Sequence, residues 1–511
     1  MAIRSQNIPT FPCIPQHSSA IFPHRTRHTF FSRSSQMHAS TSTSPNDHGE
    51  REFDAASLSV TAMSGTGYDA ACPSPAPPGS PGRDSLDLEQ GIETASNTLL
   101  RFLYVTSFLQ GVSCGILEPF CQNELAPRKV FGALACSGLH GCYILGTLLL
   151  TPWTAKLMLK DIKMRTLFSW GLFIEGACCF SYEVLKPFKH SFVTGFIRVI
   201  QGVGASLVFP GYFFVICVQF PEDIPTLIPK FGAVFSLGMV LWSYSSGFLF
   251  GANVLMFPFV CVGCLLLICS FWAPFMLPQY RQKHGGFKIG IGSFLADESV
   301  LVDLAIMANA FLLFVSNRLS LADVLLKFGP INAHSHTLMA FSSPLYILAA
   351  SMWARMRMTK FRIRLMSLLG AGVSLAGLSI AASLDKLSDD QRQHTCAIVA
   401  SQVFIIGGCG VSFVSAFVHC YLQDTREIGA RYSHIVLSGV TCTAISFGNF
   451  AGILFHTYIM DGLPYVQGIY SMLQTQLVIF ILLCTTAVFC RIQPRDVGRL
   501  GYVNPDGSLR L

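Results

Sequence analysis

The sequence contains few charged residues. Only 12% of its 511 residues are Asp, Glu, Lys or Arg, whereas soluble domains carry about 25%. Hydrophobic residues make up 51% of the chain, and its mean hydropathy is +0.50. Charge is absent altogether from Phe231 to Tyr280, a run far longer than the roughly 20 apolar residues that one membrane-spanning helix needs. These absences exclude a set of soluble domains and predict an all-α polytopic membrane protein.

Several kinds of functional site are missing as well. The sequence has no Gly-x-x-x-x-Gly-Lys-Ser/Thr phosphate loop and no His-Glu-x-x-His zinc motif. Most of its 18 cysteines lie in apolar runs, where Cys packs as a small hydrophobic residue. The pair Cys261 and Cys264 has redox or zinc-like spacing, but no histidine lies beside it. We therefore expect no enzyme activity, no cofactor and no metal site.

The net charge of +7 does not predict a nucleic-acid partner. The basic residues gather in short loops between apolar segments, which is the pattern of membrane topology signals. Loops after the even-numbered predicted spans hold fifteen Lys and Arg, and loops after the odd-numbered spans hold eight. Because such residues favour the cytosolic side, both termini are expected in the cytosol.

The first 96 residues differ in composition from the rest. They are rich in Ser, Thr, Pro, Gly and His, a composition that predicts disorder because too little apolar surface can be buried. The first 46 residues contain four arginines and no acid, as in organellar transit peptides. A cytosolic tail with regulatory Ser and Thr residues is the favoured interpretation, and a targeting segment is the alternative.

Twelve apolar segments follow this tail. An internal repeat divides them, because Trp153 and Trp353 each precede a basic loop after the second and the eighth segment. We predict twelve transmembrane helices in two pseudo-symmetric six-helix halves, residues 97–277 and 300–490, with a linker at 278–299 and a cytosolic tail at 491–511. The predicted spans are 99–120, 131–153, 166–184, 192–218, 231–252, 254–277, 300–318, 335–354, 365–383, 395–419, 433–457 and 467–490.

The run from Arg198 to Pro210 is the most informative stretch. It places Arg198, Gln201, Gly202 and Gly204 within an otherwise apolar helix. A charge at membrane depth is costly, so such a residue usually faces the bundle interior and marks a pathway. The glycines predict close approach of a neighbouring helix, and packing is the expected task of Gln201. The alternative for Arg198 is a side chain that extends to the outer interface.

The order Arg-x-x-Gln-Gly-x-Gly-Ala resembles the fourth-helix motif of the major facilitator superfamily, particularly its proton-coupled antiporters. Thr151-Pro152 and Ser343-Pro344 are similar to Ser-Pro pairs of the vesicular amine transporter branch. The resemblance covers residues 99 to 490. It implies secondary transport, with Arg198 taking part in proton coupling or in closing the cavity.

Two family motifs are altered. Ala155 and Leu159 replace a glycine and an aspartate of the loop after the second span, and only Gly238 and Gly247 remain of the glycine-rich antiporter signature in the fifth. These glycines are expected to support helix packing. The loss of the signature leaves open a facilitative uniporter of sugar, amino acid or carboxylate.

Several titratable residues are candidates for a proton or solute pathway. Glu175 is the deepest carboxylate, and an interaction with Arg198 is geometrically possible; a fixed cation stabilises an ionised carboxylate, so moving it away promotes protonation. Glu118 and Asp323 occupy similar places in the repeat, with solvated boundary residues as the alternative. His140 can exchange protons near neutral pH, or it can be a hydrogen-bonded structural residue. Asp303 begins the seventh span and is expected to be a helix-start residue.

The sequence therefore predicts a secondary transporter of a small organic solute, with organic cations or amines favoured and proton coupling as a hypothesis. Its expected partners are the solute, protons and membrane lipid. A non-transporting membrane sensor or scaffold is the alternative from a different class, favoured by the altered motifs and the long Ser/Pro-rich tail.

Overall fold

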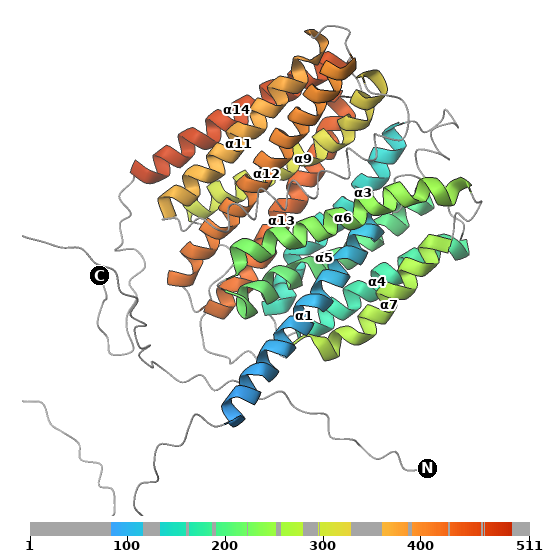
Figure 1. The fold of residues 1–511 in the computed structure, drawn as a ribbon, viewed down its shortest axis with the longest axis vertical. Coiled ribbons are helices and arrows are strands. Elements are labelled where there is room, and N and C mark those ends of the chain that lie inside the picture. Colours follow the sequence, from blue (N-terminus) through green and yellow to red (C-terminus); the bar gives the residue numbers. More distant parts are fainter. Residues whose placement is uncertain are drawn as a thin grey trace, which may run out of the picture. The chain divides into compact units, whose positions relative to one another are not determined.

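The computed structural model describes a set of helices with gaps between them (Figure 1). No strand occurs in the part of the chain that it describes. These residues belong to one compact unit, Gly79–Leu511. The described residues are 83–115, 133–159, 163–185, 191–221, 223–251, 257–278, 295, 297–328, 360–386, 391–427, 430–460, 463 and 465–492.

Eleven α-helices lie within these ranges, and each overlaps one predicted span. The predicted span at 335–354 lies outside the described residues, and α1 begins well before its predicted start at 99. A 3-10 turn at Leu384–Lys386 and a π turn at His456–Met460 complete the helical elements. The α-helices are α1 (Arg83–Gly115), α3 (Ala133–Leu159), α4 (Met164–Leu185), α5 (Ser191–Gln219), α6 (Ile224–Gly251), α7 (Phe257–Met276), α9 (Glu298–Phe328), α11 (Lys360–Ala382), α12 (Gln391–Glu427), α13 (Ala430–Phe455) and α14 (Tyr465–Ile492).

Seven of the described helices are long and apolar enough to cross a membrane. Their outer faces carry large hydrophobic side chains, such as Phe271, which is 71% exposed on α7. In lipid such a surface needs no protein cover, because hydrocarbon tails are as apolar as the side chains. The predicted number of twelve spanning helices goes beyond these seven and stays a prediction. The seven segments are 192–219, 257–276, 298–321, 362–382, 393–423, 433–459 and 467–489.

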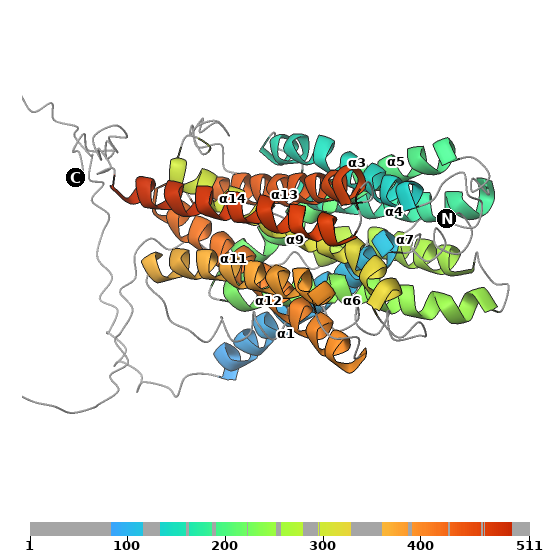
Figure 2. The ribbon, with the colours of Figure 1, turned by 90° about the horizontal axis from the view of Figure 1, so that it is seen from above.

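The helices pair in an order that recurs along the chain. In the first part α1 packs on α6, and α4 packs on both α5 and α7. In the second part α9 packs on α13, and α11 packs on both α12 and α14. The α11 and α12 helices lie side by side in both views (Figure 1, Figure 2). The two six-helix halves themselves stay a prediction, because Trp353 and its loop lie outside the described residues.

Glycines allow α5 to lie unusually close to α3, and α6 to lie unusually close to α1. A Cβ atom on Gly202 of α5 would collide with the carbonyl oxygen of Tyr143 on α3. A Cβ atom on Gly238 of α6 would collide with the carbonyl oxygen of Phe108 on α1. Gly247 also lies on α6, but its contacts are outside the part of the structure described. Small residues at helix crossings let backbones approach and gain van der Waals contact.

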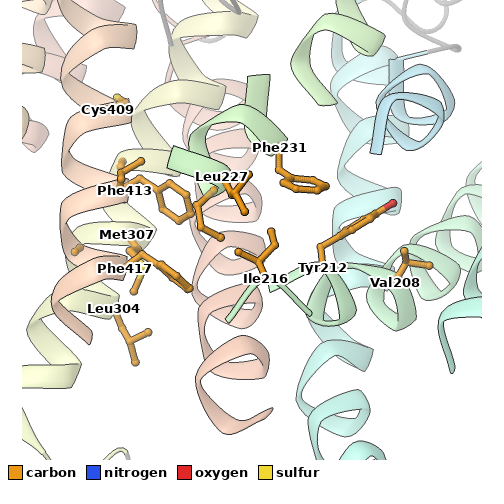
Figure 3. Packing of buried hydrophobic residues seen from close by; sticks show 14 of the residues in the cluster. Val208, Tyr212, Ile216, Leu227, Phe231, Leu304, Met307, Cys409, Phe413 and Phe417 are labelled. Atoms are coloured by element: carbon orange, nitrogen blue, oxygen red, sulfur yellow. The ribbon is translucent and has the colours of Figure 1, made fainter. Parts of the chain in front are cut away.

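Apolar side chains connect the first set of helices, α1 to α7, to the second set, α9 to α14. Phe413 and Phe417 of α12 lie with residues of α9 on one side of the core, and Tyr212 and Ile216 of α5 lie on the other (Figure 3). The ring of Phe417 is 5.3 Å from that of Phe213 on α5, centroid to centroid. A second cluster joins Tyr143, Ile144 and Met239 of the first set to Val315 and Ile453 of the second. The two sets of helices therefore share an apolar interface.

Candidate functional site

The side chain of Arg198 lies inside the bundle. It is 2% exposed and sits two turns from the start of α5 at Ser191. Its Nη1 donates hydrogen bonds to the Ser113 carbonyl at 3.2 Å and to Gln201 Oε1 at 2.8 Å, and its Nη2 donates to the Cys114 carbonyl at 2.9 Å. A buried guanidinium needs such acceptors, because desolvation otherwise penalises the charge. This placement is inconsistent with a side chain extended to the interface.

Gln201 extends the network from Arg198 toward α4. Its Nε2 donates to Ser113 Oγ on α1 at 2.6 Å and to Cys179 Sγ on α4 at 3.7 Å. The Tyr143 ring of α3 lies 5.5 Å from Arg198 Cζ, within the range of a cation–π interaction. Polar contacts from four helices therefore meet at Arg198 and Gln201. We call Gln110, Ser113, Tyr143, Glu175, Cys179, Arg198 and Gln201 the arginine cluster.

Glu175 belongs to this cluster but does not pair directly with Arg198. Its side chain is fully buried on α4, and Oε1 accepts a hydrogen bond from Gln110 Nε2 on α1 at 2.7 Å. Its Oε2 has no hydrogen-bond partner in the structure. A Cβ atom on Gly204 of α5 would lie 2.9 Å from Glu175 Cγ, so this glycine makes room for the carboxylate. Glu175 and Arg198 are linked indirectly, since Cys179 lies one turn from Glu175 and contacts Gln201.

The other candidates lie apart from the cluster or outside the described side chains. His140 is half-buried on α3, and the charges of both Arg198 on α5 and Arg318 on α9 act on it. Asp323 lies on α9, but its side chain is not among those described, and Glu118 lies outside the described residues. The structure therefore brings Arg198, Gln201, Gly204 and Glu175 together, with His140 within electrostatic range.

Two buried polar pairs of the second set were not predicted. Asn317 of α9 and Gln402 of α12 exchange two hydrogen bonds, at 2.7 and 3.1 Å. Asp303 was expected to be a helix-start residue, but it lies fully buried on α9, and its Oδ2 is 2.6 Å from His419 Nδ1 on α12. An isolated acid and an isolated histidine in two apolar runs were the available signals. Their partnership required knowledge of which helices are neighbours.

No group of three or more His, Cys, Asp or Glu side chains suited to a metal ion occurs among the described residues. The chemistry available to the arginine cluster is proton binding and hydrogen bonding. It can bind a proton at the carboxylate of Glu175, and it can bind polar groups through its amides and guanidinium.

Comparisons with known proteins find transporters that are similar to this chain in sequence and one that is similar in structure. No protein-family model matches the chain. The chain is 25% identical over 221 residues to the mouse MFS-type transporter SLC18B1, covering 41% of this chain and 47% of that protein. The rat protein of the same name is 23% identical over 192 residues, with 36% and 42% covered, and the human protein is 25% identical over 174 residues, with 33% and 38% covered. The chain spans less than half the length of these curated relatives.

The crystal structure of the human organic anion transporter MFSD10 (TETRAN) superimposes on 76% of this chain and 99% of its own. The TM-score is 0.56, and the sequences are 12% identical. The fold is that of the major facilitator superfamily. The resemblance predicted from the motif around Arg198 is thereby confirmed.

The major facilitator fold has two consequences for this chain. Its apolar helices form a multi-pass integral membrane protein, as the hydropathy predicted. The proteins that it resembles in sequence and in structure are transporters rather than enzymes. The arginine cluster therefore lies within a bundle of the kind that major facilitator transporters use.

Proposed function

We propose that this chain is a secondary transporter that carries a small organic solute across a membrane by alternating access. Two six-helix halves would rock about a central site, with both termini in the cytosol. The observation that carries the proposal is the buried position of Arg198, which joins α1 to α5 beside the carboxylate of Glu175. The recurring helix pairs and the major facilitator fold support the two-half arrangement.

Glu175 is the group through which we propose proton coupling. One oxygen of its carboxyl group accepts a hydrogen bond from Gln110, and the other has no partner and can carry a proton. Arg198 is held by carbonyl oxygens and by Gln201 rather than by Glu175 itself. A movement of α5 relative to α4 would change the distance between this fixed cation and the carboxyl group. Proton binding would thereby follow the movement of the helices.

Organic cations or amines are the favoured solutes. The resemblance of the Thr151-Pro152 pair to the vesicular amine branch supports this class, as does the carboxylate of Glu175. Organic anions are the second candidate. Arg198 and Arg318, from opposite sets of helices, both act electrostatically on His140, and positive charges favour a negatively charged group nearby.

Solute-triggered proton movement tests the proposal. The purified full chain would be placed in liposomes that contain a pH-sensitive dye, and amines, organic anions, amino acids and sugars would be added in turn. The wild-type chain is expected to respond to one class of solute. Glu175→Gln keeps an oxygen that can accept from Gln110 but removes the titrating group. It should therefore abolish the proton signal while labelled solute still exchanges.

Arg101→Ala is the matched control, because Arg101 is an exposed arginine on α1 outside the arginine cluster. This variant should transport as the wild type does. An unchanged proton signal in Glu175→Gln would overturn the role of Glu175. If the folded wild-type chain gave no proton signal but took up a labelled solute, it would be a uniporter. Silence in both assays would favour a sensor or scaffold and would contradict the proposal.

A further inference from the structure

We propose that the amide pair of Asn317 and Gln402 is a solute-binding element in the second set of helices, and that it binds a neutral polar group such as a hydroxyl. The inference rests on the proposed transport function and specifies the chemistry of the solute. Asn317 of α9 and Gln402 of α12 exchange two hydrogen bonds, and the residues are 7% and 6% exposed. The bonds join two helices, while the position and the remaining hydrogen-bonding capacity of the pair suit a second role.

Two glycine crossings allow positions in the two sets of helices to be compared. In the first set, a Cβ atom on Gly204 of α5 would lie 2.9 Å from the carbonyl oxygen of Gly171 on α4. In the second set, a Cβ atom on Gly408 of α12 would lie 2.5 Å from the carbonyl oxygen of Gly370 on α11. Both crossings join helices that occupy the same place in the recurring order of helix pairs. They are therefore equivalent points from which residues can be counted.

Counted from these crossings, Gln402 is the counterpart of Arg198. Arg198 lies six residues before Gly204, and Gln402 lies six residues before Gly408. Arg198 bonds to carbonyl oxygens of α1, the first helix of its set, and Gln402 bonds to Asn317 of α9, the first helix of the second set. Transporters built from repeats bind their solutes near the membrane midplane, at the interface of the repeats. The pair therefore lies where the second set is expected to meet a solute.

The neighbours of the pair face the first set of helices. Arg318 directly follows Asn317, and its Nη1 donates to the Met239 sulfur of α6 at 3.7 Å. Phe413 lies three turns after Gln402 on the same face of α12. It packs in the core that connects the two sets (Figure 3). The pair thus belongs to the faces of α9 and α12 that turn toward the other set.

The reciprocal bonds use only half of the hydrogen-bonding capacity of the two amides. Each amide has two N–H groups and two oxygen lone pairs, and the pair uses one of each. On either edge of such a ring, the second N–H of one amide lies beside the second lone pair of the other. A hydroxyl or carboxamide complements this edge because it both donates and accepts. An ammonium group only donates and a carboxylate only accepts, so each satisfies half of the edge.

The two sets would consequently recognise different parts of one solute. The arginine cluster supplies charged groups in the first set, whereas the amide pair in the equivalent place of the second set supplies none. A charged solute that also carries a hydroxyl or amide group would contact both. The favoured solute class is therefore an organic amine with such a neutral polar group.

Binding of matched compounds to the purified full chain tests the site. The probes are phenethylamine with its hydroxylated form phenylethanolamine, and phenylpropionate with its hydroxylated form phenyllactate. Equilibrium dialysis of the protein in nanodiscs measures each dissociation constant. The wild type is expected to bind the hydroxylated member of the amine pair about tenfold more tightly, because it gains hydrogen bonds to the amide edge. The double variant Asn317→Leu with Gln402→Leu should bind both members alike.

Ser401→Ala is the matched control, because Ser401 Oγ donates to the Ile398 carbonyl of its own helix. This variant should keep the wild-type preference. A preference retained by the double variant would show that the amides only join helices, and would overturn the proposal. Equal affinity of the wild type for both members of each pair would overturn it as well, without the need for a variant. The absence of binding by every probe would overturn the assigned solute class.

The binding site and the transport function can fail separately. A hydroxyl preference in binding, with no movement of that compound into liposomes, would refute transport and leave the site intact. Transport by a chain that binds both members of each pair equally would refute the site and leave the proposed function intact.

Discussion

Arg198 and Glu175 show how a charge can be kept in an apolar bundle. The guanidinium donates hydrogen bonds to two carbonyl oxygens of α1 and to the amide oxygen of Gln201. The carboxyl group has one amide donor and an unpaired second oxygen. The first residue therefore has its hydrogen bonds largely satisfied and joins two helices, while the second retains an oxygen that can change its protonation. This contrast assigns a structural role to Arg198 in addition to any role in coupling.

Replacing Arg198 should destabilise the protein in proportion to the hydrogen bonds that are lost. Arg198→Ala removes the three hydrogen bonds that Arg198 donates, and each bond to a charged group contributes about 1.5–3 kcal/mol. Removal of the buried charge offsets part of that loss. We expect the thermal midpoint of unfolding to fall by about 5 °C or more. Intrinsic fluorescence of the protein in detergent measures this midpoint. The thermal midpoint of Arg198→Lys should lie between those of the wild type and Arg198→Ala, because an ammonium group cannot reach all three acceptors. Arg101→Ala is the control, and equal midpoints for the two alanine variants would contradict the prediction.

Pairs of helices are held by two kinds of contact, close glycine crossings and buried amide bonds. Gly202 places α5 directly against the backbone of α3, and the same stretch carries Arg198. The Asn317 and Gln402 pair joins α9 to α12 by reciprocal hydrogen bonds. A glycine crossing depends on the absence of a side chain. The amide pair depends on the presence of both amide side chains. Substitutions should therefore affect them in different ways.

Gly202→Ala should force α5 away from α3. The added methyl group meets the Tyr143 carbonyl, which is backbone and cannot turn aside. Gly407→Ala on α12 is the matched control, because no atom lies within 4 Å of its added Cβ. That control should be neutral or should stabilise the helix by about 0.5–1 kcal/mol. Thermal midpoints measure both effects, and a Gly202→Ala chain as stable as the control would show that the crossing is looser than described.

The amide pair should behave as a coupled unit in a double-mutant cycle. Asn317→Leu or Gln402→Leu alone leaves a buried amide without its partner, which costs about 1–3 kcal/mol. The double variant removes both amides and should recover much of the stability of the wild type. The thermal midpoints of the wild type, the two single variants and the double variant give the coupling free energy between the two amides. Additive losses would indicate that the two amides contribute independently.

At the scale of the whole molecule, the described residues of the two sets meet where α13 packs on α3 and α5 and where α12 packs on α6. The α3 helix contacts α13, where a Cβ atom on Gly439 would collide with the Cβ of Ala155. The α5 helix contacts α12 through Phe213 and Phe417. Both of these contacts are apolar. They suit an interface that forms and separates.

A disulfide across this interface should lock the two sets together. Ala155→Cys with Gly439→Cys places one cysteine on each side of the contact between α3 and α13, and the two helices must move apart there before the Cβ atoms reach the roughly 3.5–4.5 Å separation of a disulfide. A protease site inserted between residues 279 and 294 would separate the chain into two fragments, which should stay joined until a reductant is added. Solute exchange should stop on oxidation and recover on reduction. Each single cysteine variant is the control, and full exchange by the oxidised double variant would contradict alternating access through this contact.

The sequence by itself determined the local properties of this protein. Hydropathy is a sum over neighbouring residues, so the apolar runs predicted a helix at each of the eleven described positions. The cost of a charge at membrane depth predicted that Arg198 would face the interior, and the glycines beside it predicted close helix packing. The resemblance of this stretch predicted the major facilitator fold.

Only the tertiary structure decided which polar groups meet. Gln110 was not singled out, yet it is the donor to Glu175, and Cys179, one turn after Glu175 on α4, contacts the Gln201 that bonds to Arg198. Asp303 was expected to be a helix-start residue, but it bonds to His419, 116 positions away. A residue in an apolar helix shows its partner only when the neighbouring helix and its register are known. Several helices present similar faces, and packing energy, not local sequence, selects among them.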